Sequence, residues 1–293
     1  MSLPSPADKR RRFRSRLGAV GLVSAPGIYD MISARLADGM DFDCLYLTGY
    51  GVVASHLGLP DAGIATYSDM VSRVGQMARG TATPMIADGD TGYGGLLNVQ
   101  HTVRGYEAAG AIGIQLEDQE FPKKCGHTPG RRVIPAEDMI KKIRVAVESR
   151  RSADFLVIAR TDARTTLGLD EALRRAEAYA KAGADVLFVE SPESEEEMRT
   201  IGRAFDLPLV ANMVEKGRTP LLSREELQAL GFRLAIFPVT ALLAALRAMS
   251  GVYAHFRDTG SSAGVAVPLQ DFADLTKLMG FEDVWEFDRT HED

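Results

Sequence analysis

The sequence predicts an α/β protein whose single domain, residues 1–293, is a (β/α)8 barrel. Eight short apolar runs follow one another along the chain, and longer amphipathic stretches separate them. This alternation indicates parallel strands joined by helices, in either a doubly wound sheet or a barrel. The count of eight favours the barrel. A chain of 293 residues suits one such domain, because no linker or low-complexity stretch interrupts it.

The predicted elements follow in a regular order. The strands are residues 21–25, 44–49, 84–90, 113–118, 155–163, 186–191, 207–213 and 234–240. Between them, the patterns at 169–185 and 223–231 predict helices, and "YEAAGA" and "YAKAGA" indicate helix ends followed by glycine. Residues 241–293 form a C-terminal helical segment, left over once the barrel is complete, with helix predicted at about 268–288.

The composition excludes several classes of protein. A net charge of −6 and a pI near 5.5 disfavour general binding to nucleic acid or to membranes. The basic run at 8–16 predicts a solvated helix rather than a localisation signal. No apolar run approaches the ~20 residues that span a bilayer, and no signal peptide is visible. Two cysteines do not make a disulfide framework, so we expect a cytoplasmic protein.

Charged or amide residues end five of the predicted strands. Burying a charge without a partner is costly, so these residues need an explanation. In a barrel they converge at the rim formed by the carboxyl ends of the strands, where barrel active sites lie. Together they predict a functional site at that rim. The five residues are Asp88, Glu117, Arg160, Glu190 and Asn212.

A cluster of carboxylates at this rim predicts a metal site. Asp88 and Asp90 are two residues apart on extended chain, so their side chains point to the same side and repel unless a cation lies between them. Glu117 and the loop residue Asp61 raise the number of oxygen donors to four. Oxygen ligands suit Mg²⁺, which usually keeps several waters. The alternative is a pair of surface or capping aspartates.

Arg160 and two glycine-rich stretches are candidates for substrate binding. Arg160 offers a fork to a substrate carboxylate, although an ion pair with Glu190 or Glu117 would also explain it. "LTGYG" at 47–51 ends a strand in small residues whose backbone N–H groups could hold an anion. The run at 88–95 lacks the lysine and the spacing of nucleotide-binding loops.

The stretch "KKCGH" at 123–127 places a thiol beside three potential cations. Either it is an exposed loop with an incidental cysteine, or Cys125 has a proton that moves, because thiol reactivity follows positive neighbours and access. Cys44 lies in a predicted strand and is expected to be a small buried hydrophobe. The remaining histidines stand alone, which favours core or surface roles: His56, His101, His255 and His291.

Six stretches together resemble the isocitrate lyase/phosphoenolpyruvate mutase superfamily. They run in order over about residues 20–240: "YLTGYGVVAS", "DGDTGYG", "QLEDQEFPKKCGH", "IARTDA", "VESP" and "NMVEKGRTP". The Lys-Lys-Cys-Gly-His loop is similar to that of the lyase branch, which includes 2-methylisocitrate lyase and 2,3-dimethylmalate lyase. Members acting on phosphonates typically lack this cysteine. The resemblance implies a barrel and a homotetramer, a dimer of dimers that swap the last helix.

The resemblance also implies a role for each matching residue. Asp88 is the main direct ligand of Mg²⁺, with Mn²⁺ as a substitute, and metal-bound waters are held by Asp61, Asp90 and Glu117. Cys125 is the general acid, Lys123 and His127 tune it, and Tyr46 lies near the substrate's 2-hydroxyl. The implied substrate-binding residues are Thr48, Gly49, Tyr50, Gly126, His127, Arg160, Glu190 and Asn212.

Two departures concern the substrate more than the chemistry. Thr48-Gly49-Tyr50 stands where methylisocitrate lyases usually have Ser-Gly-Gly, and Asn212 opens Asn-Met-Val-Glu where they have Asn-x-Thr-Glu. "MVEKGRTP" and the tail "FADLTKLMGFEDVWEF" are more similar to the dimethylmalate lyases.

We therefore expect a Mg²⁺-dependent C–C lyase whose partner is a small carboxylate of the 2-methylisocitrate or 2,3-dimethylmalate type. It releases pyruvate or a similar 2-oxo acid and an acid such as succinate or propionate. Cys125 protonates the departing carbon from a loop that is open in the free protein and closes over substrate. The alternatives are a phosphonate mutase or hydrolase, an oxaloacetate-acting relative, and a catalytically silent barrel. Cys125 argues against the first, and the complete set of carboxylates argues against the last.

Overall fold

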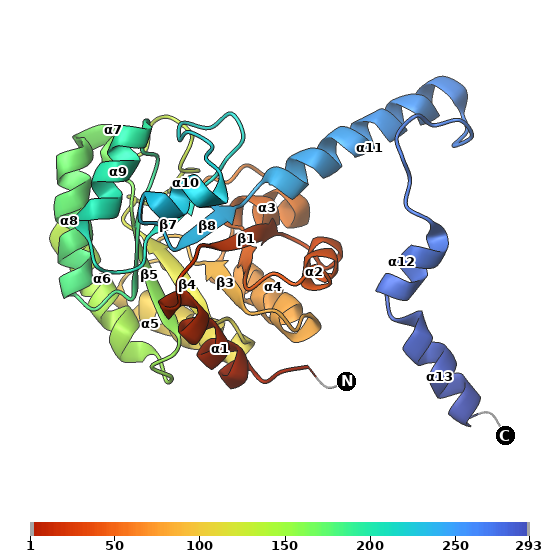
Figure 1. Cartoon of the computed structure of the whole chain (residues 1–293), viewed down its shortest axis with the longest axis horizontal. Coiled ribbons are helices and arrows are strands. Elements are labelled where there is room, and N and C mark those ends of the chain that lie inside the picture. The colour runs from red at the N-terminus through yellow and green to blue at the C-terminus, as the bar shows by residue number, and fades with distance from the viewer. Residues whose placement is uncertain (1–2, 292–293) are drawn as a thin grey trace. The chain divides into compact units, whose positions relative to one another are not determined.

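The structure is a computed structural model and describes residues 3–291. The eight strands are β1 Val23–Ile28, β2 Leu45–Leu47, β3 Met85–Asp88, β4 Gly113–Glu117, β5 Leu156–Thr161, β6 Val186–Val189, β7 Val210–Asn212 and β8 Leu234–Phe237. All pair in parallel, in the order β6-β5-β4-β3-β2-β1-β8-β7. A parallel bridge between Leu187 and Leu209 links the two end strands. The sheet is thus a nearly closed barrel surrounded by helices, which confirms the predicted fold class (Figure 1).

The helices connect successive strands. Those of the barrel are α1 Pro6–Gly18, α2 Met31–Asp38, α3 Gly49–Val52, α4 Tyr67–Gly80, α5 Leu96–Ala109, α6 Ala136–Ser149, α7 Arg164–Leu167, α8 Leu169–Lys181, α9 Glu195–Ala204 and α10 Arg224–Ala229, with the π-helix η1 at Val53–Leu57. Both predicted glycine stops are confirmed: Gly110 and Gly183, just after α5 and α8, have φ of 109° and 104°. Side-chain caps fix the starts of others, as Ser223 does for α10.

Seven strands lie inside the predicted ranges, but β1 runs beyond its predicted end at residue 25. Pro26 and Gly27 usually interrupt a strand, yet they pair with Phe237 and Tyr46 of the flanking strands. An added Cβ on Gly27 would collide with the backbone of Pro238. The glycine therefore permits a close approach of two strands rather than a turn.

The N-terminal helix is present but is not simply solvated. Phe13 and Leu17 of α1 belong to the hydrophobic core, and the Lys9 ammonium is buried and donates to the carbonyl oxygens of Ala78 at 2.9 Å and Thr81 at 2.5 Å. The basic run at 8–16 therefore includes one buried face. The high charge of the run had predicted a helix exposed to solvent on all sides.

The described chain divides into two compact units after Ala241. The second unit contains most of α11 Thr240–Thr259, followed by α12 Phe272–Leu278 and α13 Phe281–His291. The predicted helix at about 268–288 is thus two short helices, and α11 precedes it. The single-domain assignment of residues 1–293 stays a prediction, and residues 1–2 and 292–293 lie outside the described part. Between residues 3 and 291, no helix is both long and apolar enough to cross a membrane.

Candidate active site

The strand ends bring the predicted polar residues together. Arg160, near the end of β5, has Nη1 3.3 Å from Glu190 Oε2 and Nε 3.5 Å from Glu117 Oε2. Asn212, the last residue of β7, donates from Nδ2 to Glu190 Oε2 at 3.1 Å. Asp88 ends β3, and all five side chains are buried. The expected convergence at the carboxyl ends of the strands is therefore present.

Asp88 is fixed by its immediate neighbours. Its Oδ1 accepts the N–H of Asp90 at 3.1 Å and Gln115 Nε2 at 3.4 Å. Gln115 in turn accepts the Tyr46 hydroxyl at 3.1 Å, so Tyr46 reaches Asp88 through an amide. Gly49 lies so close that an added Cβ would be 2.6 Å from Asp88 Oδ2. The missing side chain of Gly49 makes room for this carboxylate.

Lys123 brings one positive charge to the carboxylates. Its Nζ lies 2.5 Å from Asp61 Oδ1 and 2.6 Å from Asp90 Oδ1, with all three side chains buried. Burial lowers the pKa of Lys123, but Asp90 and Asp61 outweigh it and the net pKa is raised well above its usual range. The Lys123 ammonium therefore faces predicted metal-site residues, and its tuning of Cys125 stays a prediction.

The carboxylates still fit a bound Mg²⁺. Burial raises the pKa of Asp90 to about 7 against the lowering effect of Lys123, and burial raises the pKa of Glu117 well above its usual range. Glu117 Oε1 has no hydrogen-bond partner among the described residues. A cation would relieve both features. Within residues 3–291, no group of three or more His, Cys, Asp or Glu side chains is arranged to hold a metal ion directly.

Two of the three guanidinium nitrogens of Arg160 donate to Asp162, a residue that the sequence analysis did not identify. Asp162 accepts from Nε at 2.9 Å and from Nη2 at 2.9 Å, closer than the two predicted glutamates. The guanidinium also lies over Phe188, with Cζ 5.2 Å from the ring centroid. A substrate carboxylate would therefore have to use the opposite edge of Arg160, where it would share Nη1 with Glu190. The signal was present, because residues 160 and 162 both fall in the predicted strand 155–163, where alternate side chains point to the same side.

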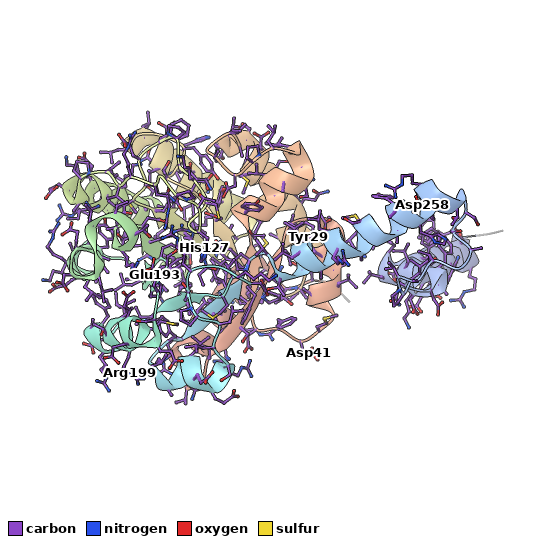
Figure 2. All side chains as sticks on the ribbon, turned by 90° about the horizontal axis from the view of Figure 1, so that it is seen from above. Tyr29, Asp41, His127, Glu193, Arg199 and Asp258 are labelled. Atoms are coloured by element: carbon purple, nitrogen blue, oxygen red, sulfur yellow. The ribbon has the colours of Figure 1, made fainter. Side chains whose placement is uncertain are left out.

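His127 is a neutral donor rather than a cation. Its Nδ1 accepts the Arg218 N–H at 3.2 Å, which places the ring proton on Nε2, 3.4 Å from Glu190 Oε1. Burial lowers the pKa of His127 despite the nearby Glu190. The Arg218 guanidinium also donates to Glu193 Oε1 at 3.2 Å. The positions of His127 and Glu193 can be followed in Figure 2. Of the three potential cations near Cys125, His127 is therefore neutral.

Loop 119–131 lies over the strand ends. Ser191 Oγ donates to the carbonyl oxygen of Gly126 at 3.0 Å. Gly126 is so close to Arg160 and Glu190 that an added Cβ would collide with both side chains. The loop is thus closed in this structure, and its opening in the absence of substrate stays a prediction.

Cys125 is half-buried in this loop, and its thiol is not acidified. Burial raises the pKa of Cys125, and a hydrogen bond from the His127 backbone N–H offsets this only in part. The expectation of a thiol made acidic by its neighbours is therefore wrong. The raised pKa keeps the proton on sulfur at neutral pH, which is the state that a general acid needs. Cys44 is fully buried, as expected of a small hydrophobe.

Two of the backbone N–H groups at 47–51 that could hold an anion are already hydrogen-bonded within the protein. Thr48 N–H donates to the Ile28 carbonyl at 3.1 Å, and Gly51 N–H donates to the Thr48 hydroxyl at 3.3 Å. Thr48 thus caps α3, and the Tyr50 side chain is exposed. A substrate role for Thr48, Gly49 and Tyr50 stays a prediction.

A buried ionic network beneath the site was also missed. Asp118 accepts from Thr161 Oγ1 at 2.7 Å, from the Asp162 N–H at 2.8 Å and from Tyr179 OH at 2.8 Å. Arg175 Nη1 lies 3.1 Å from Asp118 Oδ2. These contacts join the ends of β4 and β5 to α8 and support β5, from which Arg160 extends.

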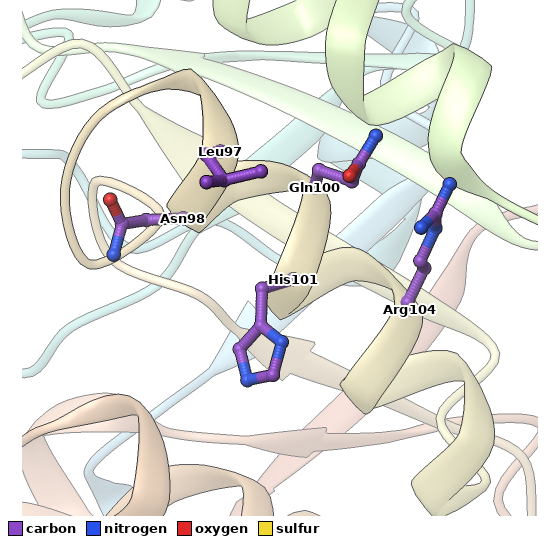
Figure 3. Close-up of a pocket in the computed structure, with 5 residues that line it drawn as sticks. All are labelled: Leu97, Asn98, Gln100, His101 and Arg104. Carbon is purple, nitrogen blue, oxygen red and sulfur yellow. The ribbon is translucent and has the colours of Figure 1, made fainter.

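The lone histidines lie at the surface, within the predicted alternatives. His56, His101 and His291 are exposed, and His255 is partly exposed. His101 packs on Tyr67 with ring centroids 4.4 Å apart and borders a hollow along α5 (Figure 3). Leu97, Asn98, Gln100 and Arg104 complete the lining of this hollow. It contains none of the predicted site residues.

Comparison with known families matches residues 13–257 to the phosphoenolpyruvate phosphomutase model. A 2,3-dimethylmalate lyase of Eubacterium barkeri is 45% identical over 280 residues, which cover 96% of this chain and 97% of that protein. A 2-methylisocitrate lyase of Aeropyrum pernix is 42% identical over 262 residues, covering 89% of this chain and 84% of that protein.

Solved structures agree with these relatives. An oxaloacetate acetylhydrolase in complex with the inhibitor 3,3-difluorooxalacetate has a TM-score of 0.92 and 37% identity, covering 98% of both chains. A phosphonopyruvate hydrolase in complex with oxalate and Mg²⁺ has a TM-score of 0.87 and 30% identity, covering 97% of this chain and 99% of that one.

Proposed function

Because this chain belongs to the phosphoenolpyruvate phosphomutase family, we propose that it is a Mg²⁺-dependent C–C lyase acting on a substituted malate. The substrate is a 2-hydroxy acid with a carboxylate on C3, of the 2,3-dimethylmalate or 2-methylisocitrate type. The products are pyruvate or a similar 2-oxo acid and a second carboxylic acid. Two free cysteines fit a reducing compartment such as the cytoplasm.

The observation that carries this proposal is the position of Cys125, in a loop that lies over the strand ends. A base takes the proton of the 2-hydroxyl, the C2–C3 bond breaks, and C3 leaves as an enolate-like anion that must receive a proton. Cys125 lies in the loop that covers Arg160 and Glu190, and its raised pKa keeps a proton available. Cys125 is therefore the general acid, and the closed loop excludes water from the departing carbon.

The other site residues bind and orient the substrate. Asp88, with Asp61, Asp90 and Glu117 around it, would hold Mg²⁺, or Mn²⁺ in its place. The bound ion would lower the pKa of the 2-hydroxyl and stabilise the developing carbonyl oxygen. Arg160 holds a substrate carboxylate by the edge opposite Asp162, beside Glu190. Glu190, Asn212 and the neutral His127 form one hydrogen-bonded group at the same strand ends.

The test is a substrate panel with purified protein. We expect release of a 2-oxo acid from 2,3-dimethylmalate or 2-methylisocitrate with Mg²⁺, and none in excess chelator. Asp88→Ala should abolish turnover and leave a folded protein, because it removes one of several crowded carboxylates. Full activity in excess chelator, or no 2-oxo acid from any substituted malate, would overturn the proposal.

A second candidate is cleavage of oxaloacetate. The similarity to a solved oxaloacetate acetylhydrolase, with a TM-score of 0.92, supports it. Oxaloacetate and isocitrate therefore belong in the same panel. Oxalate formed from oxaloacetate, without 2-oxo acid from the malates, would select this candidate. A phosphonate-acting enzyme is disfavoured because Cys125 would then have no role.

A further inference from the structure

We propose that Arg131 is a positioning residue that couples closure of loop 119–131 to the orientation of Arg160. The two arginines do not need to touch, because Asp162 lies between them and bonds to both. The inference rests on the proposed function, in which Arg160 binds a substrate carboxylate.

The first link is the pair of hydrogen bonds between Arg160 and Asp162. Both are 2.9 Å long, and together they fix the plane of the guanidinium from one edge. Phe188 limits movement on one face. The direction in which the opposite edge of Arg160 points therefore depends on where the Asp162 carboxylate is held.

The second link is the contact between Asp162 and Arg131. Arg131 Nη1 donates to Asp162 Oδ1 at 2.6 Å, the same oxygen that accepts from Arg160 Nη2. Both side chains are fully buried. Burial would raise the pKa of Asp162, but Arg160 and Arg131 outweigh it, and the pKa is lowered. One ionised carboxylate is thus shared by two guanidinium groups, and the loss of either changes its position.

The third link is the place of Arg131 in the chain. It is the last residue of the loop that carries Lys123 and Cys125, and its Nη2 donates to Thr165 Oγ1 at 2.5 Å. The loop base is closed by the Glu120 N–H, which donates to the Arg132 carbonyl at 2.8 Å. Arg131 thus joins the base of the loop to Asp162. A shift of this base when the loop opens or closes would therefore be passed through Asp162 to Arg160.

A simple anchoring role for Arg131 is the competing explanation, and a double-mutant cycle separates the two. Arg131→Met should lower kcat/KM by at least ~10-fold, the size expected for losing a charged hydrogen bond. In an Arg160→Lys background, which has already lost the planar guanidinium, the same change should lower kcat/KM by less than ~3-fold. Losses that multiply would show that Arg131 acts independently of Arg160 and would overturn the inference.

Arg132 supplies the matched control. It is the next residue, carries the same charge, and is 77% exposed in a pair with Glu120. Arg132→Met should leave kcat/KM and the melting temperature unchanged. Arg131→Lys, which keeps the charge but cannot reach Asp162 and Thr165 together, should recover part of the loss. It replaces Arg131→Met in the cycle if that variant does not fold.

Oxalate affinity in the presence of Mg²⁺, measured by calorimetry on the same variants, keeps the two proposals distinguishable. A wild-type chain that is inactive on the panel but binds oxalate would reject the proposed function, and the oxalate cycle would still test the coupling. Additive effects on oxalate affinity would overturn the coupling alone. A wild-type chain that neither turns over substrate nor binds oxalate would overturn both.

Discussion

The Cys125 thiol is the residue on which the proposed chemistry depends. Cys125→Ser keeps the size and shape of the side chain but replaces the thiol with a far weaker acid. We expect kcat to fall by about 10²–10⁴-fold, the range for loss of general acid catalysis. Affinity for the substrate and the melting temperature should change little, because the proton transfer matters in the transition state.

Steady-state kinetics and calorimetric binding of oxalate with Mg²⁺ would check this prediction. Cys44→Ala is the control, since Cys44 is fully buried in the barrel and should affect stability rather than kcat. A Cys125→Ser enzyme within a few-fold of the wild-type kcat would move the acid role elsewhere, with His127 as the next candidate.

At the residue scale, sequence reasoning found the side chains that end strands and missed those that support them. Asp88, Glu117 and Arg160 were predictable because a charge at the end of an apolar run needs a reason to be there. Asp118 and Arg131 gave no such signal, because their partners come from distant segments that only the fold brings together. The directions in which the pKa values of Cys125 and His127 are shifted also depend on burial, which the sequence does not reveal.

Loop 119–131 is the element that completes the candidate site. Its closure requires a glycine at position 126, since an added Cβ would collide with Arg160 and Glu190. Gly126→Ala should therefore hold the loop away from the strand ends and reduce kcat/KM by at least ~10-fold. Trypsin should also cut after Lys124 faster than in the wild type, because the raised loop is more accessible.

Gly18→Ala is the control for this substitution, because nothing lies within 4 Å of the position that its Cβ would occupy. It should leave kinetics, proteolysis and melting temperature as they are. Wild-type kcat/KM in Gly126→Ala would mean that the closed loop is not the productive arrangement.

At the scale of elements, the apolar runs predicted where strands occur better than they predicted the residue at which each strand begins or ends. All eight strands were found, because a barrel strand is buried on both faces and reads as a continuous apolar run. The end of β1 was misplaced because Pro26 and Gly27 usually mark a turn. Helix α11 was predicted only as part of the helical segment 241–293, without bounds of its own.

At the scale of the whole molecule, the second unit has little core of its own. No side chain of α11, α12 or α13 is buried within the described chain. Large apolar side chains are exposed along these helices, among them Leu246, Tyr253, Phe272, Trp285 and Phe287. Exposed apolar surface of this extent marks an interaction site. We propose that a second copy of this chain covers it, in a homotetramer built from dimers that swap this segment.

Trp285 provides a direct test of this assembly. It is the only tryptophan of the chain, it is 54% exposed in a single copy, and its ring centroid lies 6.0 Å from that of Phe281. If a partner covers α13, the fluorescence of Trp285 should be blue-shifted and protected from quenching by iodide, at concentrations where light scattering reports a tetramer.

Trp285→Lys should place a charge in the interface and lower the measured mass, because an unpaired buried charge is costly. Val20, which is 85% exposed on the barrel unit, gives the control Val20→Lys, for which the mass should not change. A monomer whose tryptophan is readily quenched at every concentration would contradict the assembly and leave the barrel to act as a single copy.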